Sequence, residues 1–334
     1  MNSILVLGSG SWGTALSQVL LSNKDNEVSI YGINKDQLND LNNQKNTTFF
    51  GNLSLSYKYH AIYDSLDILK TKKFDYILIA VPSNSIENCL NEINEKSKYE
   101  FNLINASKGF IIKNNETLSS LLKRKKYDKV RSFSAILGPG FAIDVVEKKF
   151  TVLNVLCDDL IIANQVCNLF NNDFFKTFAD TNLEASELLA NMKNPLAIIV
   201  GILHGLNISI NVISAFITKG IQEILALITK LNLNPLSIAQ YSGIGDIFLT
   251  CSSTKSRNYS YGLEIAKYKT SNEAIKHYDK TVEGKEAILV IHELFQKHHV
   301  HSIVYKNLYL VIKEELSAKE FYEKTKLEFL NLKV

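Results

Sequence analysis

The sequence contains few of the residues that mark exported or metal-binding proteins. Among its 334 residues there are four cysteines, four prolines and one tryptophan. The cysteines show neither the close pairing of a zinc site nor the density of a disulfide scaffold, since they stand at Cys89, Cys157, Cys167 and Cys251. We therefore expect a protein of the reducing cytoplasm without a metal centre.

An excess of charge of one sign and a long apolar run are also missing. A net charge of +3 forms no basic stripe for nucleic acid, so we expect a small-molecule substrate. The most apolar late stretch, Leu196–Leu206, has about half the length needed to cross a bilayer and predicts a buried helix. Ser3–Leu7 follows no basic region and precedes no cleavage site, so it predicts a strand rather than an export signal. We expect no membrane insertion.

The first half of the chain alternates short β-rich runs with amphipathic segments. The predicted strands are Ser3–Leu7, Val28–Tyr31, Tyr76–Val81, Phe101–Asn105, Phe133–Leu137 and Phe150–Leu156. The predicted helices include Trp12–Leu21, Lys35–Leu41 and Ile86–Ile93. This alternation is typical of an α/β domain with a parallel sheet covered on both faces, and we assign the doubly wound sheet to residues 1–180.

After about residue 180 the strand pattern fades. Apolar residues recur at helical spacing from Leu183 to Leu231, interrupted only by Pro195, and again in Gly284–Phe295 and Ile303–Leu330. The chain length also fits two domains. We predict that residues 181–334 form an all-helical second domain.

Three glycines follow the first predicted strand at the spacing G-x-G-x-x-G. Gly8 would make a tight turn, Gly10 would let backbone N–H groups reach a pyrophosphate, and Gly13 would let a helix pack closely on the strand. The helix that follows would direct its positive dipole end at the phosphates. The pattern favours a dinucleotide site, and a turn that merely packs well is the alternative.

The second predicted strand ends without the acidic residue that usually binds the adenosine ribose. Gly32-Ile33-Asn34-Lys35 follows it, and the first carboxylate is Asp36. Without a carboxylate to repel a 2′-phosphate, NADP is acceptable as well as NAD, and Lys35 would favour it. The sequence leaves the cofactor preference open.

Several further motifs follow one another in an order that spans residues 3 to about 325. Besides Gly8-Ser9-Gly10-Ser11-Trp12-Gly13-Thr14-Ala15 they are Val81-Pro82-Ser83, Ala106-Ser107-Lys108-Gly109, Gly138-Pro139-Gly140-Phe141-Ala142, Met192-Lys193-Asn194, Gly243-Ile244-Gly245-Asp246-Ile247-Phe248-Leu249-Thr250-Cys251, Ser256-Arg257-Asn258 and Val282-Glu283-Gly284. The ordered set resembles the bacterial NAD(P)-dependent glycerol-3-phosphate dehydrogenase family. The resemblance implies a Rossmann-like NAD(P)-binding domain at 1–180 and a helical substrate-binding domain at 181–334, of the type found in 6-phosphogluconate dehydrogenase.

The resemblance implies reversible hydride transfer between NAD(P)H and dihydroxyacetone phosphate, which gives sn-glycerol 3-phosphate for glycerophospholipid synthesis. Hydride addition to a ketone carbon leaves charge on oxygen, so a nearby acid must protonate it. Lys193 lies in an otherwise apolar helical stretch, where burial would lower its pKa toward the working range. The matching lysine of the family is the proton donor and acceptor, and the resemblance also implies a homodimer.

The resemblance assigns the remaining site residues. Asp246 would fix substrate hydroxyls or orient Lys193, and Thr250 would lie on the same face if this segment is helical. The catalytic set is Lys193, Lys108 and Asp246. The residues expected to contact the cofactor are Gly8, Gly10, Ser11, Trp12, Gly13, Lys108, Ala142, Arg257, Val282 and Glu283. The residues expected to contact the substrate are Lys108, Gly138, Gly140, Lys193, Asn194, Asp246, Thr250, Ser256, Arg257 and Asn258.

The sequence departs from the family pattern at three places. The family usually has a hydroxyl residue at Gly140, alanine at Asn191, and aspartate at His204. Two alternatives stay open: another β-hydroxyacid-type dehydrogenase, and a non-catalytic dinucleotide sensor that kept the fold. Arg257 argues against the first because a substrate phosphate needs a cation, and Lys193 argues against the second.

Four other features are predicted to be structural. We expect a solvated histidine cluster at His292, His298, His299 and His301, and a charged helix end at Lys123-Arg124-Lys125-Lys126. We also expect an unreactive cysteine at Cys251 and a tyrosine stripe in the core at Tyr305 and Tyr309.

Overall fold

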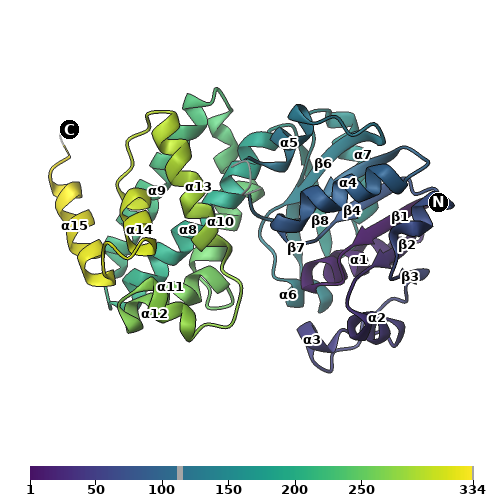
Figure 1. Cartoon of the computed structure of the whole chain (residues 1–334), viewed down its shortest axis with the longest axis horizontal. Helices are drawn as coiled ribbons and strands as arrows, with labels where there is room; N and C mark the ends of the chain where they lie inside the picture. The colour runs from purple at the N-terminus through teal and green to yellow at the C-terminus, as the bar shows by residue number, and fades with distance from the viewer. Residues whose placement is uncertain (111–115, 333–334) are drawn as a thin grey trace. The chain divides into compact units, whose positions relative to one another are not determined.

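The computed structural model describes residues 1–110 and 116–332, and the chain divides into two compact units, Met1–Glu184 and Ala185–Val334 (Figure 1). Our sequence analysis put the domain boundary near residue 180, and along the chain the division falls in the first turn of a long helix. Unit 1 contains the β-sheet. Its strands are β1 (Asn2–Leu7), β2 (Asn26–Tyr31), β3 (Ala61–Tyr63), β4 (Tyr76–Ile79), β5 (Phe101–Asn105), β6 (Val130–Leu137), β7 (Thr151–Leu156) and β8 (Phe175–Asp180).

The eight strands form one sheet in the order β3-β2-β1-β4-β5-β6-β7-β8. Neighbouring strands are parallel except β6 and β7, which pair antiparallel from Ala135 opposite Leu156 to Leu137 opposite Asn154. The prediction of a parallel sheet was therefore wrong at this pair. The chain turns back after β6 through a short helix, so β7 and its parallel partner β8 run opposite to the other strands.

Helices cover both faces of the sheet, as the alternating pattern predicted. They are α1 (Ser11–Ser22), α2 (Lys35–Asn42), α3 (Thr47–Phe50), α4 (Ile86–Lys96), α5 (Leu118–Arg124), α6 (Ala142–Val146) and α7 (Leu160–Phe170), with short 3-10 turns η1 (Leu66–Lys70) and η2 (Ser83–Ser85). Side chains of β1 alternate between two cores: Ile4 and Val6 pack in one, Leu5 and Leu7 in the other. The doubly wound fold is confirmed.

Unit 2 contains helices and loops but no strand among its described residues. Its elements are α8 (Leu183–Gly205), α9 (Ile210–Lys230), η4 (Pro235–Ala239), η5 (Tyr241–Gly245), α10 (Asp246–Cys251), α11 (Arg257–Tyr268), α12 (Ser271–Lys276), α13 (Glu283–Lys297), α14 (Val304–Ile312) and α15 (Ala318–Leu330). The two long helical stretches expected from the sequence are each broken once. The breaks contain Asn207 at φ 58° and Glu314 at φ 64°, left-handed conformations that do not continue an α-helix.

Two helices, α8 and α9, are long and apolar enough by length and composition to cross a bilayer. In α8, 89% of the most apolar window is buried inside the protein, and in α9 the share is 39%. The burial of α8 is that of a core helix, as predicted for Leu196–Leu206. Its His204 accepts or donates a hydrogen bond with the Tyr259 hydroxyl over 3.0 Å.

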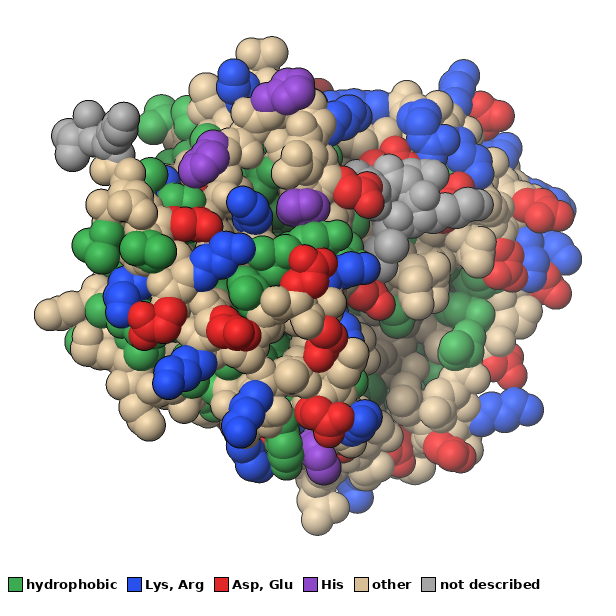
Figure 2. Space-filling model, turned by 60° about the vertical axis from the view of Figure 1, so that its left-hand side comes forward, with side chains coloured by type: hydrophobic (Ala, Val, Ile, Leu, Met, Phe, Trp, Pro, Cys, Tyr) green, Lys and Arg blue, Asp and Glu red, His purple; other side chains and the backbone are tan. Residues whose placement is uncertain are grey.

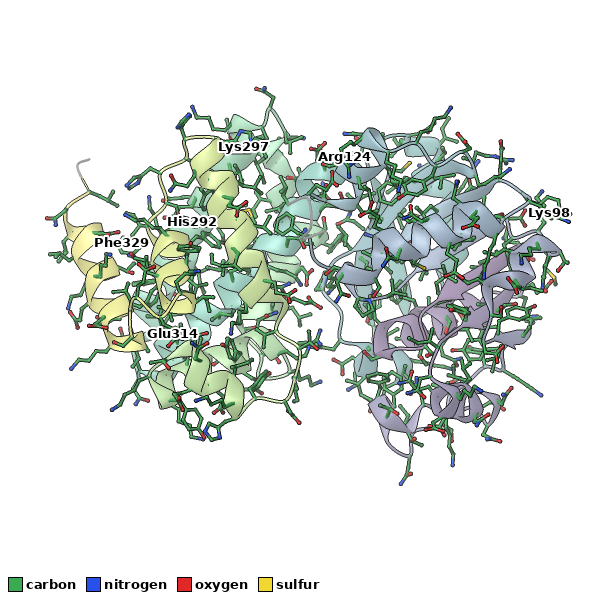
Figure 3. The ribbon with its side chains drawn as sticks, in the orientation of Figure 1. Lys98, Arg124, His292, Lys297, Glu314 and Phe329 are labelled. Carbon is green, nitrogen blue, oxygen red and sulfur yellow. The ribbon has the colours of Figure 1, made fainter. Side chains whose placement is uncertain are left out.

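Residues of the predicted histidine cluster and of the predicted charged helix end contact neighbouring side chains of the protein. Lys and Arg side chains alternate with Asp and Glu over the face in Figure 2, and the histidines on that face lie apart. His292, labelled in Figure 3, stacks on Tyr309 with ring centroids 3.8 Å apart. Arg124, at the end of α5 in the same view, pairs with Glu116. Among the described residues no group of three or more His, Cys, Asp or Glu is arranged to hold a metal.

Candidate functional site

The glycine loop between β1 and α1 uses its three glycines in three ways. Gly8 has φ +114°, and a Cβ there would lie 2.5 Å from the carbonyl oxygen of Ala80. A Cβ on Gly13 would lie 2.1 Å from the carbonyl oxygen of Gly8. A Cβ on Gly10 would meet no atom within 4 Å. Gly8 and Gly13 are therefore required by the fold, whereas Gly10 keeps a space open above the backbone.

The first turn of α1 faces this open space without a side-chain cap. Ser11 begins the helix after Gly10, and the N-cap provides no side-chain acceptor. The Trp12 indole Nε1 is buried and has no hydrogen-bond partner among the described residues. Backbone N–H groups at a helix start and an unpaired buried donor suit an anionic group with several oxygens. The loop therefore fits a dinucleotide.

Trp12 also connects the ends of neighbouring strands. The Lys108 Nζ, beyond the end of β5, lies 5.7 Å from the centroid of the Trp12 ring, a cation–π contact. A Cβ on Gly140, beyond the end of β6, would lie 3.1 Å from Trp12 Cη2, so glycine leaves room for the ring there. Gly138 of the same loop has φ +144°, and Ala142 begins α6. Unit 1 thus gathers the predicted residues of three loops at the carboxyl edge of its sheet.

A buried asparagine that the sequence analysis missed braces the glycine loop. The Asn46 amide nitrogen donates to the Ser9 carbonyl oxygen and to the Thr14 hydroxyl, each over 2.9 Å. Asn46 is completely buried. It lies in no recognisable motif, so only the folded structure reveals the contact.

The segment after β2 is the one whose missing acidic residue left the cofactor preference open. The Asn34 side chain caps α2 by accepting the N–H groups of Asp36 and Gln37. Lys35 and Asp36 are exposed in the first turn of that helix. No carboxylate precedes them at the strand end.

Unit 2 contains a buried ion pair. Lys193, in α8, and Asp246, at the start of α10, are 2% and 1% exposed, and Lys193 Nζ lies 2.6 Å from Asp246 Oδ1. Lys193 Nζ also donates to the Thr250 hydroxyl over 3.0 Å. The second carboxylate oxygen, Asp246 Oδ2, is buried without a partner among the described residues. An unpaired buried acceptor is costly, so Oδ2 has unused capacity to accept a hydrogen bond.

The local sequence explains why Asp246 and Thr250 lie together. Gly243 has a non-helical backbone, and a Cβ there would lie 2.4 Å from the Ile238 carbonyl oxygen. This tight turn lets α10 start at Asp246, so Thr250 follows one helical turn later, and its hydroxyl donates to the Asp246 carbonyl oxygen over 2.6 Å. The predicted common face of Asp246 and Thr250 is therefore present.

A second polar group connects α8, α11 and α13. Glu283 accepts from the Asn194 amide over 3.2 Å and from Arg257 Nη2 over 3.1 Å. The Gly284 N–H donates to Asn258 Oδ1 over 2.9 Å. The Arg257 side chain is half exposed, and its guanidinium carries five N–H donors, of which one nitrogen, Nη2, bonds Glu283.

The other predicted residues have mainly structural contacts. Ser256 is the N-cap of α11 and accepts the Tyr259 N–H, and Val282 is the buried residue before α13. Burial raises the pKa of the Cys251 thiol to about 12, which makes it unreactive as a nucleophile.

Comparisons with known proteins agree with this arrangement. Residues 3–163 match the model of the NAD-dependent glycerol-3-phosphate dehydrogenase N-terminus, and residues 182–323 match that of its C-terminus. The chain is 36% identical to glycerol-3-phosphate dehydrogenase [NAD(P)+] of Malacoplasma penetrans, over 100% of this chain and 98% of that protein. It is 31% identical to the protein of that name from Mesoplasma florum, over 93% and 94%.

The fold is shared with solved structures. A crystal structure of glycerol-3-phosphate dehydrogenase from Coxiella burnetii superposes with a TM-score of 0.87 at 23% identity, covering 99% of both chains. The family models and the full-length identities carry the assignment. The chain belongs to the NAD-dependent glycerol-3-phosphate dehydrogenase family of oxidoreductases.

Proposed function

We propose that the protein catalyses the reversible reduction of dihydroxyacetone phosphate to sn-glycerol 3-phosphate with NAD or NADP as cofactor. The observation that carries the proposal is the buried Lys193–Asp246 pair with its unpaired carboxylate oxygen. The family membership is consistent with this reaction.

The pair suits carbonyl reduction for a chemical reason. When bound, the reduced nicotinamide supplies a hydride to the C2 carbonyl carbon, and the carbonyl oxygen gains negative charge. Lys193 would stabilise that charge and give up a proton from Nζ, and in the reverse direction neutral Lys193 would accept it. Asp246 would hold the ammonium in place and accept a substrate hydroxyl at Oδ2. Burial of both groups strengthens these interactions, since little water screens them.

The two units would divide the binding. In unit 1 the open space at Gly10 and the unpaired Trp12 donor support binding of the dinucleotide pyrophosphate. In unit 2 the half-exposed Arg257 provides a planar donor set that suits the substrate phosphate, with Asn258 beside it. Lys108 and Gly140 would contact the cofactor and substrate from the strand ends.

We further propose a cytoplasmic homodimer whose product enters glycerophospholipid synthesis. The burial of α8 and the four cysteines outside any disulfide support this proposal. The absence of a carboxylate directly after β2 supports acceptance of NADP as well as NAD, and Lys35 would be the cation available to a 2′-phosphate.

The first test is the assay of the reaction itself. We expect the purified protein to oxidise NADH or NADPH, followed at the nicotinamide absorbance, only when dihydroxyacetone phosphate is added. Dihydroxyacetone without phosphate is the matched control, and we expect its kcat/KM to be lower by about two orders of magnitude because Arg257 loses its anion. Turnover of a β-hydroxyacid in place of the phosphate would favour the first alternative function. Cofactor binding without turnover would favour a sensor.

A second prediction concerns Asn46. Asn46→Ala removes two hydrogen bonds that hold the glycine loop, so we expect the Kd of NADH to rise about tenfold, which corresponds to about 1.4 kcal/mol. Fluorescence titration measures the Kd. Asn43→Ala, at an exposed asparagine bonded to the Asn39 carbonyl, is the control and should bind normally. A lowered melting temperature with an unchanged Kd would show that Asn46 supports only the fold.

A further inference from the structure

The turn of α8 that carries Lys193 lacks one backbone hydrogen bond. Pro195 lies inside this helix and has no N–H to donate to the carbonyl oxygen of Asn191, and its ring crowds that carbonyl. Lys193 lies between these two residues. The helix alone therefore holds the backbone of Lys193 less firmly than an uninterrupted ladder would.

A tyrosine from another helix contacts this turn. The Tyr305 hydroxyl, on α14, donates to the Met192 carbonyl oxygen over 3.1 Å. That carbonyl and the N–H of Lys193 belong to one planar peptide unit, so holding the carbonyl fixes the plane from which the Lys193 side chain departs. Tyr305 is fully buried, and burial raises the pKa of its hydroxyl well above the usual value, so it stays a donor.

Tyr305 is itself held by a buried carboxylate. Glu223, on α9, accepts the N–H groups of Ile303, Val304 and Tyr305 over 2.6, 3.1 and 3.3 Å. It also accepts the Ser302 hydroxyl over 2.6 Å. A carboxylate at the start of a helix satisfies N–H groups that have no partner within the helix and interacts favourably with its dipole. The ring of Tyr305 packs edge-on against Phe295, so its hydroxyl has little freedom.

We propose that Tyr305 is a positioning residue for the reaction: its hydroxyl holds the peptide between Met192 and Lys193 and so keeps Lys193 Nζ against Asp246 and Thr250. The inference rests on the proposed role of Lys193 as proton donor and acceptor. Tyr305 would act through Lys193, since its hydroxyl contacts the peptide that precedes Lys193. The residues proposed to bind the substrate phosphate lie on α11, so binding should change little when the hydroxyl is removed.

The test compares two buried tyrosines. Tyr305→Phe removes only the hydroxyl, and we expect kcat to fall about tenfold while the KM of dihydroxyacetone phosphate stays within about twofold. We also expect the pH profile of kcat to move, because it reports the group that transfers the proton. Tyr261→Phe is the control: Tyr261 is equally buried, and its hydroxyl bonds Ser271 instead. It should lose a similar amount of thermal stability and keep the kcat and pH profile of the wild type.

Equal losses of kcat in both variants would overturn the proposal, as would a Tyr305→Phe enzyme with wild-type kcat and pH profile. If Tyr305→Phe does not fold, Glu223→Gln is the second variant. It keeps the side-chain size but weakens the support of α14, and it should lower kcat with KM nearly unchanged. Wild-type kcat in a folded Glu223→Gln protein would then overturn the proposal.

A measurement without substrate separates this inference from the proposed function. In a protein labelled with ¹⁵N-lysine, the Nζ resonance of buried Lys193 is identified by its loss in Lys193→Met. We expect this resonance to shift or broaden in Tyr305→Phe and to stay in place in Tyr261→Phe. That result with a wild-type protein that does not reduce dihydroxyacetone phosphate would support the positioning role and reject the reaction. An unmoved resonance in both variants would reject the positioning role.

Discussion

Lys193→Ala is expected to lower the kcat for dihydroxyacetone phosphate reduction by about three orders of magnitude, since a positioned general acid typically contributes a factor of about 10² to 10⁴. The variant removes both the proton donor and the cation beside the developing oxygen charge. Initial rates at saturating NADH measure the effect. The Kd of NADH, which unit 1 would bind, should stay close to the wild-type value. Lys276→Ala, at an exposed lysine paired with Glu273, is the control and should be fully active.

Added amines provide a sharper version of this test. A small primary amine such as methylamine fits the space left by the lysine side chain and should restore part of the activity of Lys193→Ala as its concentration rises. It should have no effect on the wild type. Retention of more than about a tenth of the wild-type kcat without amine would contradict the assignment, because the proton would then come from another group.

Asp246→Asn distinguishes the two partners of the ion pair. The substitution keeps the shape of the side chain but leaves the buried ammonium of Lys193 without its counter-charge, which typically destabilises a protein by about 3–5 kcal/mol. We expect a lower melting temperature together with a large loss of kcat. Lys193→Met with Asp246→Asn should recover stability but no activity, since it removes both charges at once.

The strands that the sequence predicted are those with continuous apolar runs in the middle of the sheet. β3 was missed because it has three residues, and β8 because its burial alternates from Phe175 to Phe178, as expected of an edge strand with one exposed face. The reversed direction of β7 could not be predicted either. Strand direction depends on pairing between distant segments, and local apolar patterns are the same for parallel and antiparallel central strands.

The candidate site likewise contains features that the sequence predicts and contacts that it does not. The turn at Gly8 and the close packing at Gly13 could be deduced from the glycine spacing, and a common face for Asp246 and Thr250 from helical periodicity. The contact between Lys193 and Asp246 joins residues 53 positions apart and came only from the family resemblance. Asn46 and Tyr305 were missed as site residues. A fully buried tyrosine signals that its hydroxyl has a partner, but no sequence pattern shows that the partner is the Met192 carbonyl.

Two alanine substitutions in the glycine loop should separate its role in cofactor binding from its role in stability. Gly10→Ala adds a methyl group where the structure has no atom within 4 Å, at backbone angles that alanine adopts readily. We expect a melting temperature within about 2 °C of the wild type, which for a protein of this size is less than about 1 kcal/mol. The methyl group would occupy the space proposed for the pyrophosphate, so the Kd of NADH should rise by at least about tenfold, or 1.4 kcal/mol.

Gly13→Ala should act on the fold first. Its Cβ would lie 2.1 Å from the Gly8 carbonyl oxygen, so β1 and α1 must separate, and overpacking of this kind costs about 1–3 kcal/mol or more. We expect a melting temperature lower by several degrees. Thermal unfolding and NADH titration on both variants separate the two roles. Normal NADH affinity in a folded Gly10→Ala protein would show that the cofactor does not approach the backbone at Gly10, because nothing else in the loop contacts that methyl group.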